Sequence, residues 1–343
     1  MIAKKKEEVL GPKVDYRSIE ALNASAIKLF DKSRLDFYKQ YILKKPKEPN
    51  TSSSIILGNL TDFYLADCQG KEELFISKFD ERFGLLSVKY TPTQQYMYLS
   101  EKLFNITIKD MVDGNVTTDF RSRFEAALDS CKREDKFKGK DLDTVMLAWD
   151  GSDAETYFNE RLRCIGKDIA DEWMIDKAKS IISKVMEVEA VASEFQEIEG
   201  IQRLGKKVIE FMFYETLSKC EIDKLDIDHN KKCIIVTDVK SSYDIEDFES
   251  TYLKYRYDLA AAFYTQGVRQ WSMISDEYGD LSQYEVKFQF ITLNTSKEDI
   301  LPQIVTLNQN DLDKAFDGYS IRGRYFKGLT ELYNEIQWHK KMN

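Results

Sequence analysis

The chain has 343 residues, of which 43% are hydrophobic and 13% aromatic, which is enough to form the core of one large domain or two ordinary ones. Its 59 acidic and 50 basic side chains give a formal net charge of −9, which argues against holding nucleic acid by bulk electrostatics but leaves room for a local basic channel. With only two histidines and no long apolar run, the sequence lacks material for a His-rich zinc site, a Ser-His-Asp triad or a transmembrane helix.

The cysteines and the start of the chain bear on the cellular compartment. The five cysteines are widely spaced, with no C-x-x-C pair, and no apolar segment follows the lysine-rich start. We therefore expect free thiols, no secretory signal and a reducing, cytoplasmic environment.

The first part of the chain is predicted to be mainly helical. Asn23 and Ser33 are suited to cap the helices that follow them, because their side-chain oxygens can accept hydrogen bonds from the first free N–H groups. On the third helix, Gly58 and Asp62 are four residues apart and share a face. In chain order, we expect helices over 26–30, 34–42 and 55–67, an exposed loop over 44–54, and a mainly helical insertion over about 70–165 with helices at 93–104 and 119–132.

The second part alternates strands and helices. Residues 234–236 form a continuous apolar run, as expected of a central strand that is covered on both faces. In chain order, we expect a helix over 168–192, strands over 207–214, 219–228 and 232–240 with a hairpin turn at 229–230, and a helix over 251–266. Strands at 286–290 and 304–307 follow, and then a helical tail over 311–341 that is interrupted by Gly318, Gly323 and Gly328. This order predicts a single α/β domain over 1–343, with a mixed central sheet flanked by helices.

Two of these strands carry a candidate catalytic site. Side chains two apart on a strand share a face, so Asp238 and Lys240 point the same way, with the Val239 carbonyl between them. Asp223 lies on the preceding strand. Two carboxylates beside an ammonium group are suited to hold a magnesium ion, a water and a phosphate together, which favours phosphodiester hydrolysis. Lys240 would position the attacking water or neutralise charge on the phosphorus.

The same residues have a plainer interpretation. A D-x-K triplet after an apolar strand is common, and an Asp and a Lys at a strand end are usually a solvated edge. The neighbouring Asp226 and Asp228 are interpreted in this plain way, as surface acids close to the turn.

Taken in order, the motifs resemble the PD-(D/E)XK nucleases, in particular the branch that contains the RecB nuclease domain and exodeoxyribonuclease VIII. The second motif of that family, an Asp on a core strand, is matched by Asp223, and its third, (D/E)-x-K, by residues 238–240. Residues 23–27 and 37–41 are similar to the short helix start and the aromatic-rich second helix of its members. The resemblance spans about 16–67 and 168–343 and implies a restriction-endonuclease-like fold.

Two positions depart from the family pattern. Residues 58–62 stand where members have a G-x-x-x-H helix, so Asp62 replaces a metal-binding His; a carboxylate is still a suitable ligand for Mg²⁺ or Mn²⁺. The Q-x-x-x-Y helix falls on residues 260–264, so Tyr264 is kept as a substrate-binding candidate while Ala260 replaces the Gln that helps to organise the site. The plainer alternatives are a helix-surface acid at Asp62 and a core aromatic at Tyr264.

The resemblance implies an Mg²⁺- or Mn²⁺-dependent deoxyribonuclease, most simply an exonuclease of the phage or recombination type. Asp62, Asp223, Asp238 and the Val239 carbonyl would bind the metal, and Lys240 would be catalytic together with the two strand acids. DNA is the implied substrate, a single-strand annealing or recombination protein an implied partner, and a homo-oligomer around DNA is known among relatives.

Several alternatives stay open at this point. The chain is compatible with an endonuclease or single-strand nuclease of the same fold, or with a catalytically silent member that binds DNA or protein. The basic segments 4–6, 44–47 and 133–140 are candidate phosphate contacts or ordinary solvated charge runs. The cysteine pattern predicts no iron–sulfur cluster. The G-x-x-x-x-G-K-[ST] motif is absent from the sequence, so we expect no fused helicase or ATPase motor.

Overall fold

The computed structural model describes residues 16, 19–44, 52–112, 119–242, 247–295 and 301–342. The chain divides into two compact units. The first comprises residues 1–49, 61–71 and 179–343, and the second comprises residues 50–60 and 72–178. The helices α3 (Ser53–Asp62) and α9 (Glu172–Glu187) each have residues in both units.

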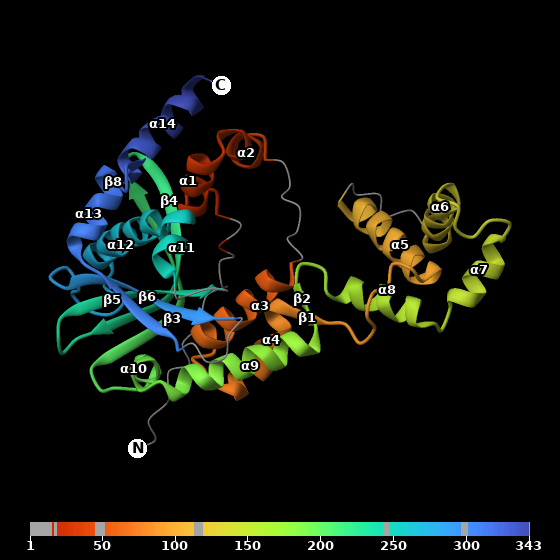
Figure 1. Ribbon diagram of the computed structural model, residues 1–343, viewed down its shortest axis with the longest axis horizontal. Helices are drawn as coiled ribbons and strands as arrows, with labels where there is room; N and C mark the ends of the chain where they lie inside the picture. The colour runs from red at the N-terminus through yellow and green to blue at the C-terminus, as the bar shows by residue number, and fades with distance from the viewer. Residues whose placement is uncertain are drawn as a thin grey trace, which may run out of the picture. The chain divides into compact units, whose positions relative to one another are not determined.

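The first unit is built on a mixed five-stranded sheet (Figure 1). The strand order is β3-β4-β5-β6-β7; β5 and β6 run parallel, and the other neighbours are antiparallel. The strands are β3 (Ile201–Phe213), β4 (Thr216–Asp228), β5 (Cys233–Ser242), β6 (Glu285–Asn294) and β7 (Gln303–Leu307). The predicted mixed α/β architecture with a central sheet flanked by helices is confirmed, and the apolar run 234–236 lies on the middle strand.

Helices of this unit pack around the sheet. The long helix α12 (Tyr257–Ile274) contacts β3, β4, β5 and β6, and its Leu259 and Phe263 are fully buried in the main core. The remaining helical elements are α1 (Ala24–Lys32), α2 (Arg34–Phe37), η2 (Tyr38–Ile42), η3 (Phe63–Asp67), α10 (Glu189–Ala192), η4 (Ser193–Phe195), α11 (Phe248–Lys254), α13 (Gln309–Asp317) and α14 (Leu329–Met342).

The second unit is mainly helical and has its own core. Phe124, Val145 and Trp149 are buried there with other apolar side chains. A short parallel pair of strands completes it, β1 with β2. The elements are α4 (Glu72–Arg82), β1 (Phe83–Leu85), α5 (Gln95–Val112), α6 (Phe120–Arg133), α7 (Leu142–Trp149), α8 (Asp153–Arg163) and β2 (Asp168–Ala170).

The predicted helix caps are confirmed. Asn23 Oδ1 accepts a hydrogen bond from the Ala26 N–H at 2.9 Å, and Ser33 Oγ accepts one from the Asp36 N–H at 3.2 Å. Both side chains satisfy N–H groups that have no partner within the first turn of a helix. The hairpin between β4 and β5 also forms as predicted, with antiparallel pairing.

Three predicted helices are wrong in part. Residues 168–170 form strand β2 rather than the start of a helix. The helix expected over 251–266 is broken between α11 and α12, where Arg256 adopts a left-handed backbone with φ of 52°. The tail over 311–341 contains a β-hairpin, β8 (Tyr319–Ile321) with β9 (Arg324–Phe326), between its two helices.

The interpretation of Asp226 and Asp228 as surface acids is wrong as well. Each is only 2% exposed. Asp226 pairs with the buried Lys224, and Asp228 accepts hydrogen bonds from the Asn230 and Lys231 N–H groups of the turn at 3.0 and 2.9 Å. Buried carboxylates are retained where such partners satisfy them.

Arg256 explains why the predicted helix is broken at this point. Its guanidinium holds Asp258 through two 3.1 Å contacts, pairs with Asp31 of α1, and donates to the Lys327 carbonyl at 2.5 Å. Tyr319 of the β8–β9 hairpin donates to the same Asp258 at 3.0 Å. One buried cation thus joins α1, the start of α12 and the hairpin.

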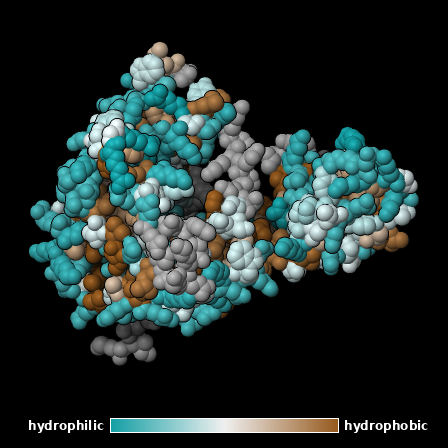
Figure 2. Space-filling model, viewed as in Figure 1, coloured by the Kyte–Doolittle hydropathy of each residue, from teal (hydrophilic) through white to brown (hydrophobic). Residues whose placement is uncertain are grey.

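None of the helices in the described ranges is both long and apolar enough to cross a membrane. The face of the molecule in Figure 2 is mainly hydrophilic, with hydrophobic residues in scattered patches.

We predict that Arg256→Met destabilises the protein by about 3–5 kcal/mol, because it leaves the buried carboxylate of Asp258 and the partly buried one of Asp31 without their cation. The matched control is Arg34→Met. In the wild type, Arg34 pairs with Glu335 at 2.6 Å, and the Arg34 side chain is 57% exposed. That change is expected to cost less than about 1 kcal/mol. Urea unfolding of both variants measures the difference, and equal losses would contradict the assigned role of Arg256.

Candidate functional site

The β4–β5 pair brings together the two strand acids of the predicted site. The antiparallel register pairs Lys224 with Thr237, which places Asp223 opposite Asp238 at the next position. Residues opposite each other on neighbouring strands share a face. Asp238 Oδ2 lies 2.7 Å from Lys240 Nζ, so the predicted common direction of Asp238 and Lys240 is borne out by the geometry.

Asp223 also holds the backbone where the two strands separate. Regular pairing ends at Lys224, and Asp223 Oδ2 accepts a hydrogen bond from the Val239 N–H at 2.9 Å. The carboxylate therefore takes over a donor that the ladder no longer satisfies. The Val239 carbonyl, which was predicted to be a metal ligand, accepts a 3.3 Å hydrogen bond from Lys240 Nζ.

A lysine that the sequence reasoning missed links Asp223 to Asp62. Lys206 Nζ lies 2.5 Å from Asp223 Oδ1 and 3.0 Å from Asp62 Oδ2. Asp62, at the end of α3, is thereby joined to the strand acids through one ammonium group. The missed signal is the Gly205-Lys206 pair just before the predicted start of the strand, because an isolated Gly in a strand indicates a close approach of another backbone segment.

Charge and burial shift the pKa values of the two strand acids in opposite directions. Burial opposes ionisation of Asp223, but the ammonium groups of Lys206 and Lys240 outweigh it and lower its pKa. Burial raises the pKa of Asp238, and the neighbouring charge of Asp223 adds to the increase despite Lys240. The two carboxylates thus behave as an unequal pair.

Both lysines stay cationic. Although burial works against the charged form, the carboxylates of Asp238 and Asp223 raise the pKa of Lys240. Asp223 and Asp62 likewise raise the pKa of Lys206 well above its usual value. Neither lysine is therefore suited to remove a proton, and each is suited to donate hydrogen bonds or to neutralise negative charge.

Tyr264 and Ala260 lie on α12, four residues apart and so on one face of that helix. Burial raises the pKa of Tyr264 well above its usual value, and the charges of Asp238 and Asp223 add to the increase. Ala260, where the family has a Gln, is 1% exposed and belongs to the main core.

A third lysine, Lys28, approaches from α1. Lys240 Nζ is 5.3 Å from the centre of the Tyr257 ring, and Lys28 Nζ is 5.6 Å from it. Burial lowers the pKa of Lys28 to about 8, and the charge of Lys240 adds to the decrease. The site therefore contains more positive charge than the sequence motif alone indicates.

The carboxylate groups of the site are potential ligands for a divalent cation. Among the described residues, no three His, Cys, Asp or Glu side chains are grouped as metal ligands would be. Asp62 and Asp223 do, however, place oxygens within 3.0 and 2.5 Å of one cationic nitrogen, and Asp238 lies beside Asp223. Carboxylate oxygens are the ligands that Mg²⁺ and Mn²⁺ prefer, so the residue types fit such an ion at the place of the ammonium.

The three basic segments predicted as candidate phosphate contacts are described only in part. Segment 4–6 and residues 45–47 fall outside the described residues. Lys44 pairs with Glu20 at 2.5 Å, and in segment 133–140 Lys138 pairs with Asp135 at 2.7 Å. Lys136 lies 3.5 Å from the centre of the Tyr98 ring.

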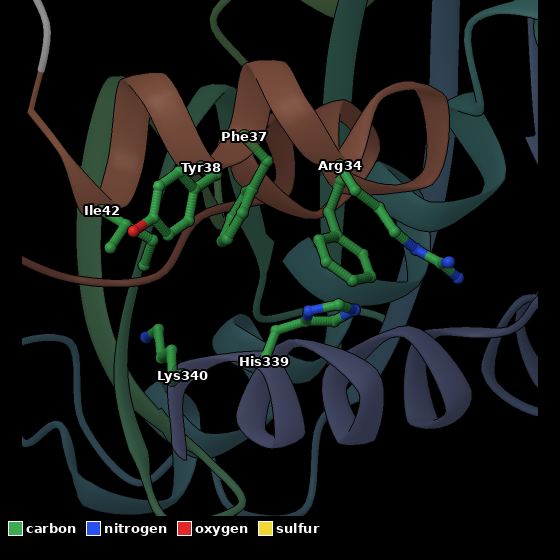
Figure 3. Close-up of a pocket in the computed structure, with 7 residues that line it drawn as sticks. Arg34, Phe37, Tyr38, Ile42, His339 and Lys340 are labelled. Atoms are coloured by element: carbon green, nitrogen blue, oxygen red, sulfur yellow. The ribbon is translucent and has the colours of Figure 1, made fainter. Parts of the chain in front are cut away.

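A small cavity of the first unit is a different kind of site. It lies between α2 with η2 and α14, where the ring of His339 faces the aromatic side chains above it (Figure 3). Its lining contains no carboxylate, so it offers no hard ligand for a divalent cation. It is lined by Phe30, Arg34, Phe37, Tyr38, Ile42, His339 and Lys340.

No protein-family model matches the chain, and no curated protein matches it. Among solved structures, it is similar to a protein from Eubacterium rectale described as a "putative exonuclease", with 14% identity and a TM-score of 0.44 over 89% of this chain and 82% of that one. A likeness this distant carries no argument about the site.

We predict opposite effects on stability for the two strand acids in a metal-chelating buffer near neutral pH. Asp223→Asn should lower the free energy of unfolding by about 1.5–3 kcal/mol, because it weakens hydrogen bonds to charged and backbone donors. Asp238→Asn should be neutral or stabilising, because the raised pKa means that its ionised form is disfavoured in the folded state. Thermal unfolding checks this, and a larger loss for Asp238→Asn would contradict it.

Proposed function

We propose that the protein is a metal-dependent DNA nuclease that hydrolyses phosphodiester bonds, and that it acts as an exonuclease of the phage or recombination type. The observation that carries the proposal is the convergence of Asp223, Asp238 and Lys240 on one face of the sheet, with Asp62 joined to them through Lys206. Residues far apart in the chain thus form one acid–lysine cluster in the order that the nuclease motifs predict.

In this proposal Asp62, Asp223 and Asp238 hold Mg²⁺ or Mn²⁺, with the Val239 carbonyl as a further oxygen ligand. The ion supplies Lewis-acid chemistry to the phosphate and lowers the pKa of a water. Lys240, kept cationic by Asp238 at 2.7 Å, donates hydrogen bonds to the attacking water or to a phosphoryl oxygen. Tyr264, on α12, is a candidate substrate contact.

A second candidate function is a catalytically silent member of the fold that binds DNA or protein. Lys206 favours it, since its ammonium lies where a metal would be shared by Asp62 and Asp223. The replacement at Ala260 favours it too, because that position is closed into the core. A DNA substrate, a recombination partner and a homo-oligomer remain predictions under either candidate.

Incubation of linear duplex DNA with the protein and Mn²⁺ tests the enzymatic proposal. Wild type is expected to degrade the DNA, and Lys240→Ala to be slower by about 10²–10⁴-fold, the usual range for losing a positioned catalytic group. The matched control is Lys287→Ala, an exposed lysine on β6 that pairs with Glu285 at 3.1 Å and should not change the rate. Intact DNA in every reaction, with a folded protein, would contradict the enzymatic proposal and favour the silent member.

Covalently closed circular DNA distinguishes an exonuclease from an endonuclease. An exonuclease needs an end, so we expect the circle to survive conditions in which the same DNA, linearised, is degraded from its ends. Gel electrophoresis over a time course distinguishes gradual shortening from internal cuts. Cleavage of circular duplex DNA or of circular single-stranded DNA would contradict the exonuclease proposal. It would favour an endonuclease or a single-strand nuclease instead.

A further inference from the structure

Lys206 occupies an irregular position in β3. Gly205 pairs with Lys224 and Lys207 with Ile222, so Lys206 and Asp223 face each other without regular pairing. The backbone of Lys206 is left-handed, with φ of 43°, which is uncommon for a residue with a side chain. Such a conformation persists only where its surroundings stabilise it, and it concentrates at functional positions.

The positions of β3 that face the core change parity beside Lys206. After it, Ile209, Phe211 and Phe213 belong to the main core, whereas before it Leu204 packs against that core. The core-facing positions therefore change from even to odd at residues 205–206, although the register with β4 is the same on both sides and neither strand gains a residue. Lys206 stands opposite Asp223 in this register, so their side chains share a face.

Gly205 brings β3 close to η3, which follows α3. A Cβ atom at this position would be 3.1 Å from the Ala66 carbonyl oxygen of η3, a contact tighter than most side chains tolerate. The backbone of β3 thus approaches the segment that directly follows Asp62. The short distance from Lys206 to Asp62 depends on this approach.

We infer that Lys206 is a built-in counter-ion that takes the cation position between Asp62 and Asp223 in the metal-free protein and is displaced when a divalent ion binds there. The inference rests on the proposed function for the presence of that ion. Lys206 is 12% exposed and contacts both carboxylates, so its ammonium neutralises acids that would otherwise repel each other. An ammonium and a divalent ion cannot both occupy this position, because like charges at contact distance repel strongly in a partly buried site.

The displacement has two measurable consequences. Lys206 stabilises the metal-free fold, because removing it leaves the acids without one of their cations. It also weakens metal binding, because the ion must first break two charged hydrogen bonds. A protein without this ammonium should therefore be less stable in chelator and bind the metal more tightly.

Calorimetric titration with Mn²⁺ tests the inference on wild type, Lys206→Met and Asp223→Asn, with melting temperatures in chelator measured in parallel. The matched control is Lys207→Met, whose amine lies on the same strand and pairs with the exposed Glu277 at 2.9 Å. Lys206→Met should bind Mn²⁺ at least about tenfold more tightly than wild type and melt at a lower temperature in chelator. Lys207→Met should match wild type in affinity, and Asp223→Asn should lose binding.

The outcomes separate this inference from the proposed function. Unchanged or weaker Mn²⁺ binding by Lys206→Met, with binding still lost in Asp223→Asn, would overturn the counter-ion role and leave the nuclease proposal standing. No binding by wild type or by Lys206→Met would overturn both. If Lys206→Met does not fold, Lys206→Gln replaces it, and Lys206→Arg, which keeps the charge, is expected to retain the weak affinity of wild type.

Discussion

Three carboxylates on one face of a sheet require compensating charge, and this constraint shapes the centre of the first unit. Asp223 and Asp238 lie opposite each other on β4 and β5, and Asp62 approaches from the end of α3. Two ammonium groups offset them, Lys206 between Asp62 and Asp223 and Lys240 beside Asp238. The left-handed backbone of Lys206 in β3 and the separation of β4 from β5 are the backbone features that make these contacts reachable.

The same strand β4 carries a second charge cluster on its other face, and the contrast indicates which of the two can meet a ligand. The side chains of Lys224 and Asp226 are 4% and 3% exposed, and Glu194 and Arg203 lie against them. In the first cluster, Asp62 and Lys240 are each 21% exposed. The inaccessible network serves to join η4 to the sheet, whereas the partly open one can exchange a cation or contact a phosphate.

The sequence predicted the parts of the fold that follow from local pattern. Strands β4 to β6, the hairpin at 229–230 and the caps at Asn23 and Ser33 follow from apolar runs and turn chemistry. It missed features fixed by distant contacts: the helix break at Arg256, which depends on Asp31 and on the Lys327 carbonyl, and the burial of Asp226. Lys206 was missed for the same reason, because a left-handed lysine in a strand is stabilised by carboxylates 17 and 144 residues away.

The most direct test of the account is a crystal structure of the wild-type protein soaked in Mn²⁺, with anomalous diffraction data that locate the ion. The account predicts an anomalous peak between the carboxylates of Asp62 and Asp223, with the Lys206 ammonium moved away from both. A saturating soak that leaves Lys206 on both carboxylates, with no manganese peak beside them, would contradict it.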